Sequence, residues 1–324
     1  MGRRSQPALR IRIEVRRLQA DDTSIPPSGS GKASLLAALA LAGTTLLLLR
    51  LGSGHTAASR RFAARPEFDV WTWAYAAYAA AAAAVGLATL PAFRLLGQAT
   101  GRGATIRAVA AWPVVGLLIL LFGPGELSAH NPLWLQYDRV TVANVVCGIF
   151  ITPSFAGLLL VQTRLSALRH EILSKVVADR AGGVIVELLW LRAALQRFLV
   201  SFGVLVSAGV LAAGALRGAL LADGVSADAI PAISLLTYGG FLTAMTALIF
   251  VPAYVTWQGQ VLDLRDKLYP VPQNGLPSRD WYQARSDFDT LLSARSSPAS
   301  VFTAAFGVLA PLAGSLVTAL MSTS

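Results

Sequence analysis

The sequence predicts an all-α membrane protein, a polytopic transmembrane helical bundle of about seven spans with amphipathic juxtamembrane helices on the cytoplasmic side. Of the 324 residues, 55% are hydrophobic and only 14% are charged, whereas about a quarter of a typical soluble domain is charged. Mean hydropathy is +0.59. Uncharged runs alternate with charged connectors, and the clearest run, 142–161, has the length of about 20 residues that crosses a hydrocarbon core.

The chain divides into a tail and one transmembrane domain. Residues 1–32 form a basic cytoplasmic tail that ends in a linker rich in Pro, Ser and Gly, and residues 33–320 hold the spans. Within the tail, residues 8–18 alternate apolar and charged side chains with the period of a β-strand. Such a strand needs a partner edge, and the alternative is a disordered basic tail near anionic lipid.

The seven expected spans follow from the positions of the apolar runs. They lie near residues 33–51, 70–93, 106–122, 142–161, 198–216, 230–255 and 301–320. A signal peptide is the alternative interpretation of the first run. Its apolar core is longer than that of a usual signal peptide, however, and no clean cleavage site ends it. We therefore expect it to be retained as a helix.

The second span has an unusual composition, because residues 74–84 are nearly all Ala and Tyr. Small residues allow helix backbones to approach closely, so we expect this helix at the centre of the bundle. Aromatic residues favour the headgroup level and fix the depth of a helix. Four of them gather in the first turns of this span: Trp71, Trp73, Tyr75 and Tyr78.

The later connectors contain amphipathic segments. One apolar stripe follows the fourth span and consists of Leu165, Leu168, Ile172 and Val176. A second piece, 184–198, leads into the fifth span, where Gly214 and Gly218 have the spacing of a close helix contact. The sixth span continues as a helix into the aqueous side. Ser278 then caps a helix that is expected on the membrane face or against the first amphipathic segment.

The distribution of basic residues predicts the orientation. With seven spans, 21 of the 27 Lys and Arg residues lie in the tail and in the connectors after spans two, four and six. The positive-inside rule then places the N-terminus in the cytoplasm and the C-terminus outside. High Ala and Arg content suggests a GC-rich bacterial genome, so the expected location is the inner (plasma) membrane.

The sequence offers no catalytic, cofactor-binding or metal-binding residues that we can assign. Acidic residues lie in tails, connectors or span edges, which disfavours a proton-coupled transporter. Cys147 is expected to serve packing. The strongest polar group is the outer connector with Glu126, His130 and Asp138, which could bind a cation or line a vestibule, and the alternative is a solvated loop.

The favoured functional interpretation is a non-enzymatic membrane effector, a pore-forming or signal-receiving protein whose cytoplasmic helices respond to a partner. One alternative is a channel or facilitator for a small solute, and another is a lipid-modifying membrane enzyme. The expected partners are anionic headgroups, a second copy of the chain and a cytoplasmic protein. Nucleic acid is not expected, because basic residues of membrane proteins face anionic lipid.

Overall fold

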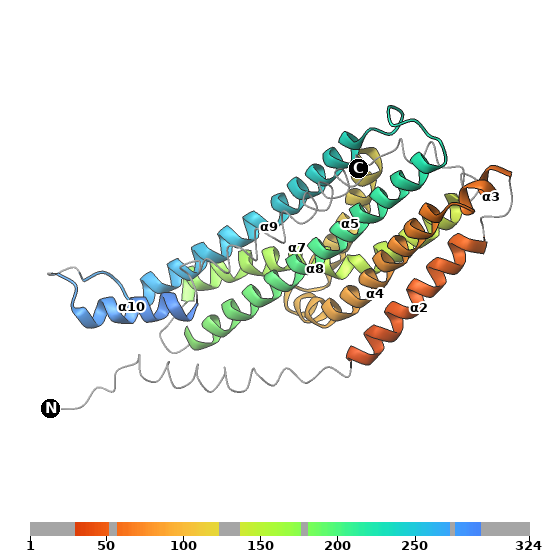
Figure 1. The fold of residues 1–324 in the computed structure, drawn as a ribbon. Coiled ribbons are helices and arrows are strands. Elements are labelled where there is room, and N and C mark those ends of the chain that lie inside the picture. The colour runs from red at the N-terminus through yellow and green to blue at the C-terminus, as the bar shows by residue number, and fades with distance from the viewer. Residues whose placement is uncertain (1–29, 52–56, 123–136, 176–180, 273–275, 293–324) are drawn as a thin grey trace, which may run out of the picture.

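The structure is a computed structural model that describes residues 30–51, 57–122, 137–175, 181–272 and 276–292. The segment 8–18 and the seventh expected span, 301–320, lie outside the described residues. Within these residues all regular structure is helical (Figure 1). The eight helices are α2 (Ser30–Leu51), α3 (Ala57–Ala63), α4 (Pro66–Thr100), α5 (Arg102–Phe122), α7 (Tyr137–Lys175), α8 (Ala181–Ala222), α9 (Ala232–Leu268) and α10 (Arg279–Leu291).

Five of these helices are long and apolar enough to cross a membrane, namely α2, α4, α7, α8 and α9. They contain the first, second, fourth, fifth and sixth expected spans, and α5 covers the third. The predicted helical membrane bundle is confirmed to this extent. The total of seven spans stays a prediction.

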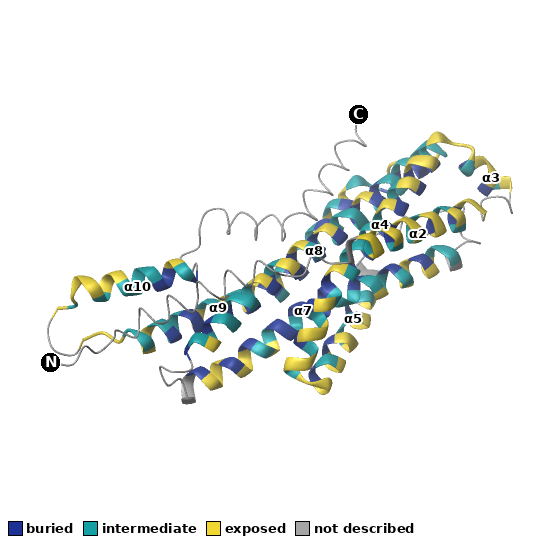
Figure 2. Ribbon diagram, turned by 90° about the horizontal axis from the view of Figure 1, so that it is seen from below, coloured by how far each residue is buried: buried dark blue, intermediate teal, exposed yellow. Residues whose placement is uncertain are grey.

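Apolar side chains cover much of the outer surface of the bundle. The outer sides of α2 and α5 carry many exposed residues, as Figure 2 shows. Large hydrophobic residues that are more than half exposed include Leu36, Leu47, Val114, Ile149 and Leu248. A surface of this kind is favourable in hydrocarbon and costly in water, so lipid is the natural solvent of these faces.

Helix α4 lies at the centre of the bundle and contacts α2, α5, α7 and α8. Ala79, Ala82 and Ala83 on its inner side have no exposed surface. An Ala side chain is small, so the backbones of neighbouring helices can come close to α4. Several helices therefore pack around it. The expectation that the Ala-rich span is central is confirmed.

The backbones of α4 and α7 approach each other closely at Gly86 of α4. A Cβ atom added there would lie 2.2 Å from the carbonyl oxygen of Phe150 in α7. Three residues further along, the hydroxyls of Thr89 and Ser154 lie 3.2 Å apart. Of the two glycines predicted for close contact, Gly214 is buried, whereas a Cβ atom at Gly218 would have no described atom within 4 Å.

The aromatic residues at the start of α4 form an interior stripe. Trp71 is 1% exposed and Tyr75 is 7% exposed, whereas Trp73 is 61% exposed. The rings of Trp71 and Tyr75 pack edge to face at 6.3 Å, and Tyr75 and Tyr78 do so at 5.8 Å. Spacings of four and three residues place these three rings on one helix face, so they fill the core. Only Trp73 points outward as expected for an anchor at the headgroups.

Helices α7, α8 and α9 are far longer than a crossing requires. They contain 39, 42 and 37 residues, which corresponds to lengths of about 55 to 63 Å, against about 30 Å for the hydrocarbon core. At one end of the bundle they run past the turn between α4 and α5, and α10 lies beside this extension (Figure 1).

We expect Gly86→Ala to destabilise the bundle, because the new methyl group would meet a backbone oxygen that cannot move independently. The free energy of unfolding should fall by about 1–3 kcal/mol. Thermal unfolding of the detergent-purified protein measures this. Gly240→Ala is the matched control, since its Cβ atom would meet nothing within 4 Å. Equal melting temperatures for the two variants would contradict the close contact between α4 and α7.

Candidate functional site

The candidate site is the extended end of the bundle, which we call the end layer. It comprises residues 162–175 of α7, 181–197 of α8 and 256–268 of α9, together with α10. Its apolar core includes Leu165, Leu168, Ile172, Leu188, Leu264 and Phe288, each at most 4% exposed. Leu165, Leu168 and Ile172 of the stripe predicted after the fourth span therefore face other helices, and Phe288 of α10 joins the same core. Val176, the fourth residue of the stripe, lies outside the described residues.

An ion-pair network joins α7 to α8. Arg164 donates two hydrogen bonds to the carboxylate of Glu187, from Nε at 2.5 Å and from Nη2 at 3.0 Å. Its Nη1 also donates to Glu171 at 3.1 Å. The side chains of Arg164 and Glu187 are 18% and 28% exposed. A bidentate pair with this degree of burial fixes the relative position of the two helices better than an exposed pair.

Polar side chains of α9 bind backbone carbonyls of the two neighbouring helices. Trp257 donates from Nε1 to the carbonyl of Leu188 in α8 at 2.9 Å. Gln260 donates from Nε2 to the carbonyl of Leu165 in α7. Helical carbonyl oxygens have a second lone pair, so they accept these bonds without losing their own helical bonds. Side chains of α9 thus bind both neighbouring helices.

Gln260 is only 1% exposed, and its Oε1 has no hydrogen-bond partner among the described residues. A buried acceptor without a partner costs about 1–3 kcal/mol. The Nε2 group of Gln260 therefore helps to position α9 against α7, while its unpartnered Oε1 lowers the stability of the folded state. The nearby Arg192 of α8 lies over the ring of Trp257, with its guanidinium carbon 5.5 Å from the ring centre.

Helix α10 begins with the predicted cap. The hydroxyl of Ser278 accepts a hydrogen bond from the backbone N–H of Trp281 at 3.3 Å. At the other end of the helix, Arg192 donates from Nη1 to the carbonyl of Leu292 at 3.1 Å. A cation beside the last carbonyls complements the helix dipole. Both ends of α10 are thus satisfied, the first by its own cap and the second by α8.

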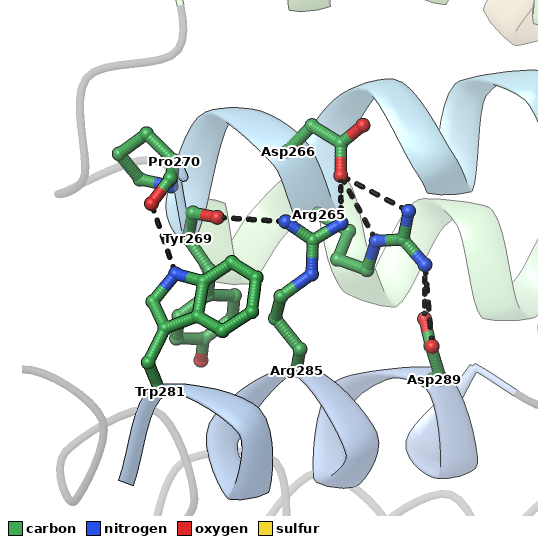
Figure 3. A network of polar contacts seen from close by, with 7 residues as sticks. All are labelled: Arg265, Asp266, Tyr269, Pro270, Trp281, Arg285 and Asp289. Carbon is green, nitrogen blue, oxygen red and sulfur yellow. Dashed lines mark hydrogen bonds and ion pairs between the residues drawn. The ribbon is translucent and has the colours of Figure 1, made fainter. Parts of the chain in front are cut away.

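A polar network attaches α10 to the end of α9 (Figure 3). Arg265 of α9 donates from Nη1 to both carboxylate oxygens of Asp289, each at 3.2 Å. In the opposite direction, Arg285 of α10 binds Asp266 and donates to the carbonyl of Tyr269 at 3.0 Å. The side chain of Asp289 is 5% exposed. Two reciprocal ion pairs, one of them with a buried carboxylate, therefore hold the helix in place.

Trp281 completes this network at the first turn of α10. Its Nε1 donates to the carbonyl of Pro270 at 2.9 Å, and the guanidinium of Arg285 lies 4.7 Å from its ring centre. The loop after α9 is thereby tied to α10. The outer side of α10 stays open to solvent, with exposed side chains at Arg279, Asp280 and Tyr282.

The connector predicted as the best polar site is not described in full. Glu126 and His130 lie outside the described residues, as does the side chain of Asp138, and their proposed cation site stays a prediction. Cys147 is fully buried, as a packing residue would be. In the part of the chain that the structure describes, no group of three or more His, Cys, Asp and Glu side chains could hold a metal ion.

The amphipathic helices of the end layer were predictable from the sequence. The residues on neighbouring helices that their polar side chains bind were not. Arg164 and Glu187 are 23 residues apart, and Gln260 binds a carbonyl 95 residues away. One feature of the sequence could have indicated these contacts: Trp257 and Gln260 lie on the apolar side of a helix. A buried Gln at that position needs a partner on a neighbouring helix.

Comparison with known proteins found no matching family model, no matching curated protein and no matching solved structure.

We expect Asp289→Asn to loosen α10, because the change removes the charge that binds Arg265. The local stability of residues 279–292 should fall by roughly 2 kcal/mol, about thirtyfold in hydrogen-exchange rate. Asp280→Asn is the matched control, since Asp280 is exposed in the first turn of the same helix. Hydrogen exchange followed by mass spectrometry measures both. Unchanged protection of α10 in Asp289→Asn would contradict the anchoring role of the ion pair.

Proposed function

We propose that the protein is a membrane effector whose end layer receives a protein partner in the cytoplasm and transmits the event to the spans. The observation that carries this proposal is the continuity of three helices. Each of α7, α8 and α9 contains a candidate span and also contributes to the end layer. A displacement at the end layer is therefore a displacement of the spans.

Rigidity of the end layer supports this proposal. Helices α7, α8 and α9 are joined by side chains that bind backbone carbonyls, including Trp257 to Leu188 and Gln260 to Leu165. A packed core with such bonds moves as a unit, because small shifts of single side chains are resisted. Force applied at α10 would then reach the membrane without being absorbed by a flexible joint.

The outer face of α10 is the surface we assign to the partner. It carries both charges and an aromatic side chain, with Arg279 and Asp280 exposed and Tyr282 59% exposed. Tyr and Arg are enriched at protein interfaces. The cytoplasmic side follows from the positive-inside rule applied to the basic connectors at this end. In response, the spans would oligomerise or open.

The test compares cells that express the full chain with cells that express Asp289→Asn. Release of α10 should alter the response of the spans, so membrane potential, read with a voltage-sensitive dye, and the oligomeric state in native gels should both differ between the two. Asp280→Asn should behave as the unaltered chain. Potential, growth and oligomeric state that are identical in all three would argue against the effector function.

A channel or facilitator for a small solute is the second candidate. A polar contact between two spans favours it, since the hydroxyl of the buried Tyr75 in α4 lies 2.6 Å from Oδ1 of Asn144, an exposed residue of α7. In the same bundle, the buried Oγ1 of Thr243 lacks a partner among the described residues. Groups of this kind are expensive in a membrane and often line solute paths.

For this candidate we expect Asn144→Leu to slow solute entry into proteoliposomes, because the amide that meets Tyr75 would be lost. Stopped-flow light scattering with glycerol or urea as the solute measures the rate. The control is Thr237→Val, since Thr237 is exposed and donates only to the carbonyl of Ile233 in its own helix. No flux above that of protein-free liposomes would exclude these solutes.

A further inference from the structure

An open groove of about 360 Å³ lies between α5 and α7 on the surface of the bundle. It has an apolar part and a polar part. Ala108 and Leu159 belong to the apolar part. The polar part consists of Arg107, Gln162, Thr163 and Ser166. Among the residues that the structure describes, no acidic side chain lines the groove, so its electrostatic character is positive.

The depth of the groove matches the boundary between hydrocarbon and headgroups. The fourth expected span ends at residue 161 and the third begins at residue 106, and the groove is lined by residues on both sides of these limits. On α7, Leu159 lies on the apolar side of this boundary, and Gln162 is the first polar residue after the span ends. The phosphate of a lipid lies at this depth, with its acyl chains directed toward the apolar side.

The donors in the groove are available for a ligand. Within the described ranges, neither the guanidinium of Arg107 nor the side-chain amide of Gln162 has a hydrogen bond or ion pair to another residue. The hydroxyls of Thr163 and Ser166 donate to carbonyls of their own helix, at 2.9 and 3.0 Å. The guanidinium and the amide therefore supply the free N–H groups, and the hydroxyls make the surroundings polar.

Two further features favour an anion here. Arg102, the first residue of α5, is exposed, and α5 begins at this end of the groove. The N-terminal end of a helix carries a partial positive charge that attracts phosphate. Arginine is also the side chain best suited to bind a phosphate with two parallel hydrogen bonds.

We propose that this groove binds one anionic phospholipid from the surrounding bilayer. Arg107 and Gln162 donate to the phosphate oxygens, and an acyl chain lies along Ala108 and Leu159. The positive side chains Arg102 and Arg107 disfavour a headgroup that carries its own cation. A lipid with a net negative charge is therefore preferred over phosphatidylcholine.

The test uses the full chain purified in detergent and native mass spectrometry with phosphatidylglycerol as the probe. Loss of the guanidinium in Arg107→Gln should weaken the retention of phosphatidylglycerol about tenfold. Arg107→Lys should keep part of the binding, because the charge remains. Ser166→Glu places a like charge beside the phosphate and should also reduce binding, and the exposed position of Ser166 tolerates the larger side chain.

Arg197→Gln is the matched control. Arg197 of α8 is exposed, and its neighbour Phe198 packs against Gly157 of α7, so Arg197 lies at a similar depth on another face of the bundle. This variant loses the same charge and should retain phosphatidylglycerol as the unaltered chain does. Melting temperatures of all variants are recorded to confirm that they are folded.

Each of the following results would overturn the proposal. The first is equal retention of phosphatidylglycerol by Arg107→Gln and the unaltered chain. The second is an equal loss in Arg197→Gln, which would mean that total charge alone matters. The third is either equal binding of phosphatidylcholine or displacement by inorganic phosphate, which would mean that a bilayer anion is not the specific occupant. Detection of a protein dimer without bound phosphatidylglycerol would also contradict the proposal.

Discussion

The contact between α4 and α7 at Gly86 is the constraint on which the arrangement of the spans depends. The absence of a side chain at Gly86 allows the backbone of α4 to reach the carbonyl of Phe150, and the hydroxyls of Thr89 and Ser154 meet beside it. In lipid there is no hydrophobic drive between apolar helices, so close packing and buried polar pairs supply the attraction. The Ala residues of α4 then allow α2 and α8 to pack against the same central helix.

The end layer is held together by different interactions from those between the spans, because it combines an apolar core with many charged groups. The core contains Leu165 and Leu188, while the network around it contains Arg164, Glu187 and Asp289. The ion pairs of Arg164 with Glu187 and of Arg265 with Asp289 each join two different helices and so restrict their relative motion. The same unbroken helices continue into the spans, which is why we place signal reception at this end of the protein.

The boundary between the spans and the end layer is chemically the most varied part of the bundle. Helices α5 and α7 change there from apolar to polar side chains, and Arg107 and Gln162 lie on the lipid-accessible side of that change. Inside the bundle, polar groups at a comparable depth bind carbonyls or one another, as Gln260 does. The side chains of Arg107 and Gln162, on the outside, have no hydrogen-bond partner among the described residues, and this difference leads to the proposed lipid site.

The sequence by itself determined the helices and their apolar character. Length and hydropathy of an uncharged run decide whether a segment crosses lipid, and these are local properties. Ser278 as the cap of α10, the central place of the Ala-rich span and the continuation of the sixth span as a helix were likewise predictable, because backbone capping and side-chain size are read within a few residues.

Only the tertiary structure decided which faces meet. Periodicity places Trp71, Tyr75 and Tyr78 on one side of α4 but does not say whether protein or headgroups cover that side. Gly86 and Gly218 look alike in the sequence, yet one lies against a backbone carbonyl and the other has open space. Gln260 binds Leu165 on α7 and Arg164 binds Glu187 on α8, at separations of 95 and 23 residues. The physical reason is that such contacts depend on the relative positions of whole helices, which are fixed by the sum of all their packing.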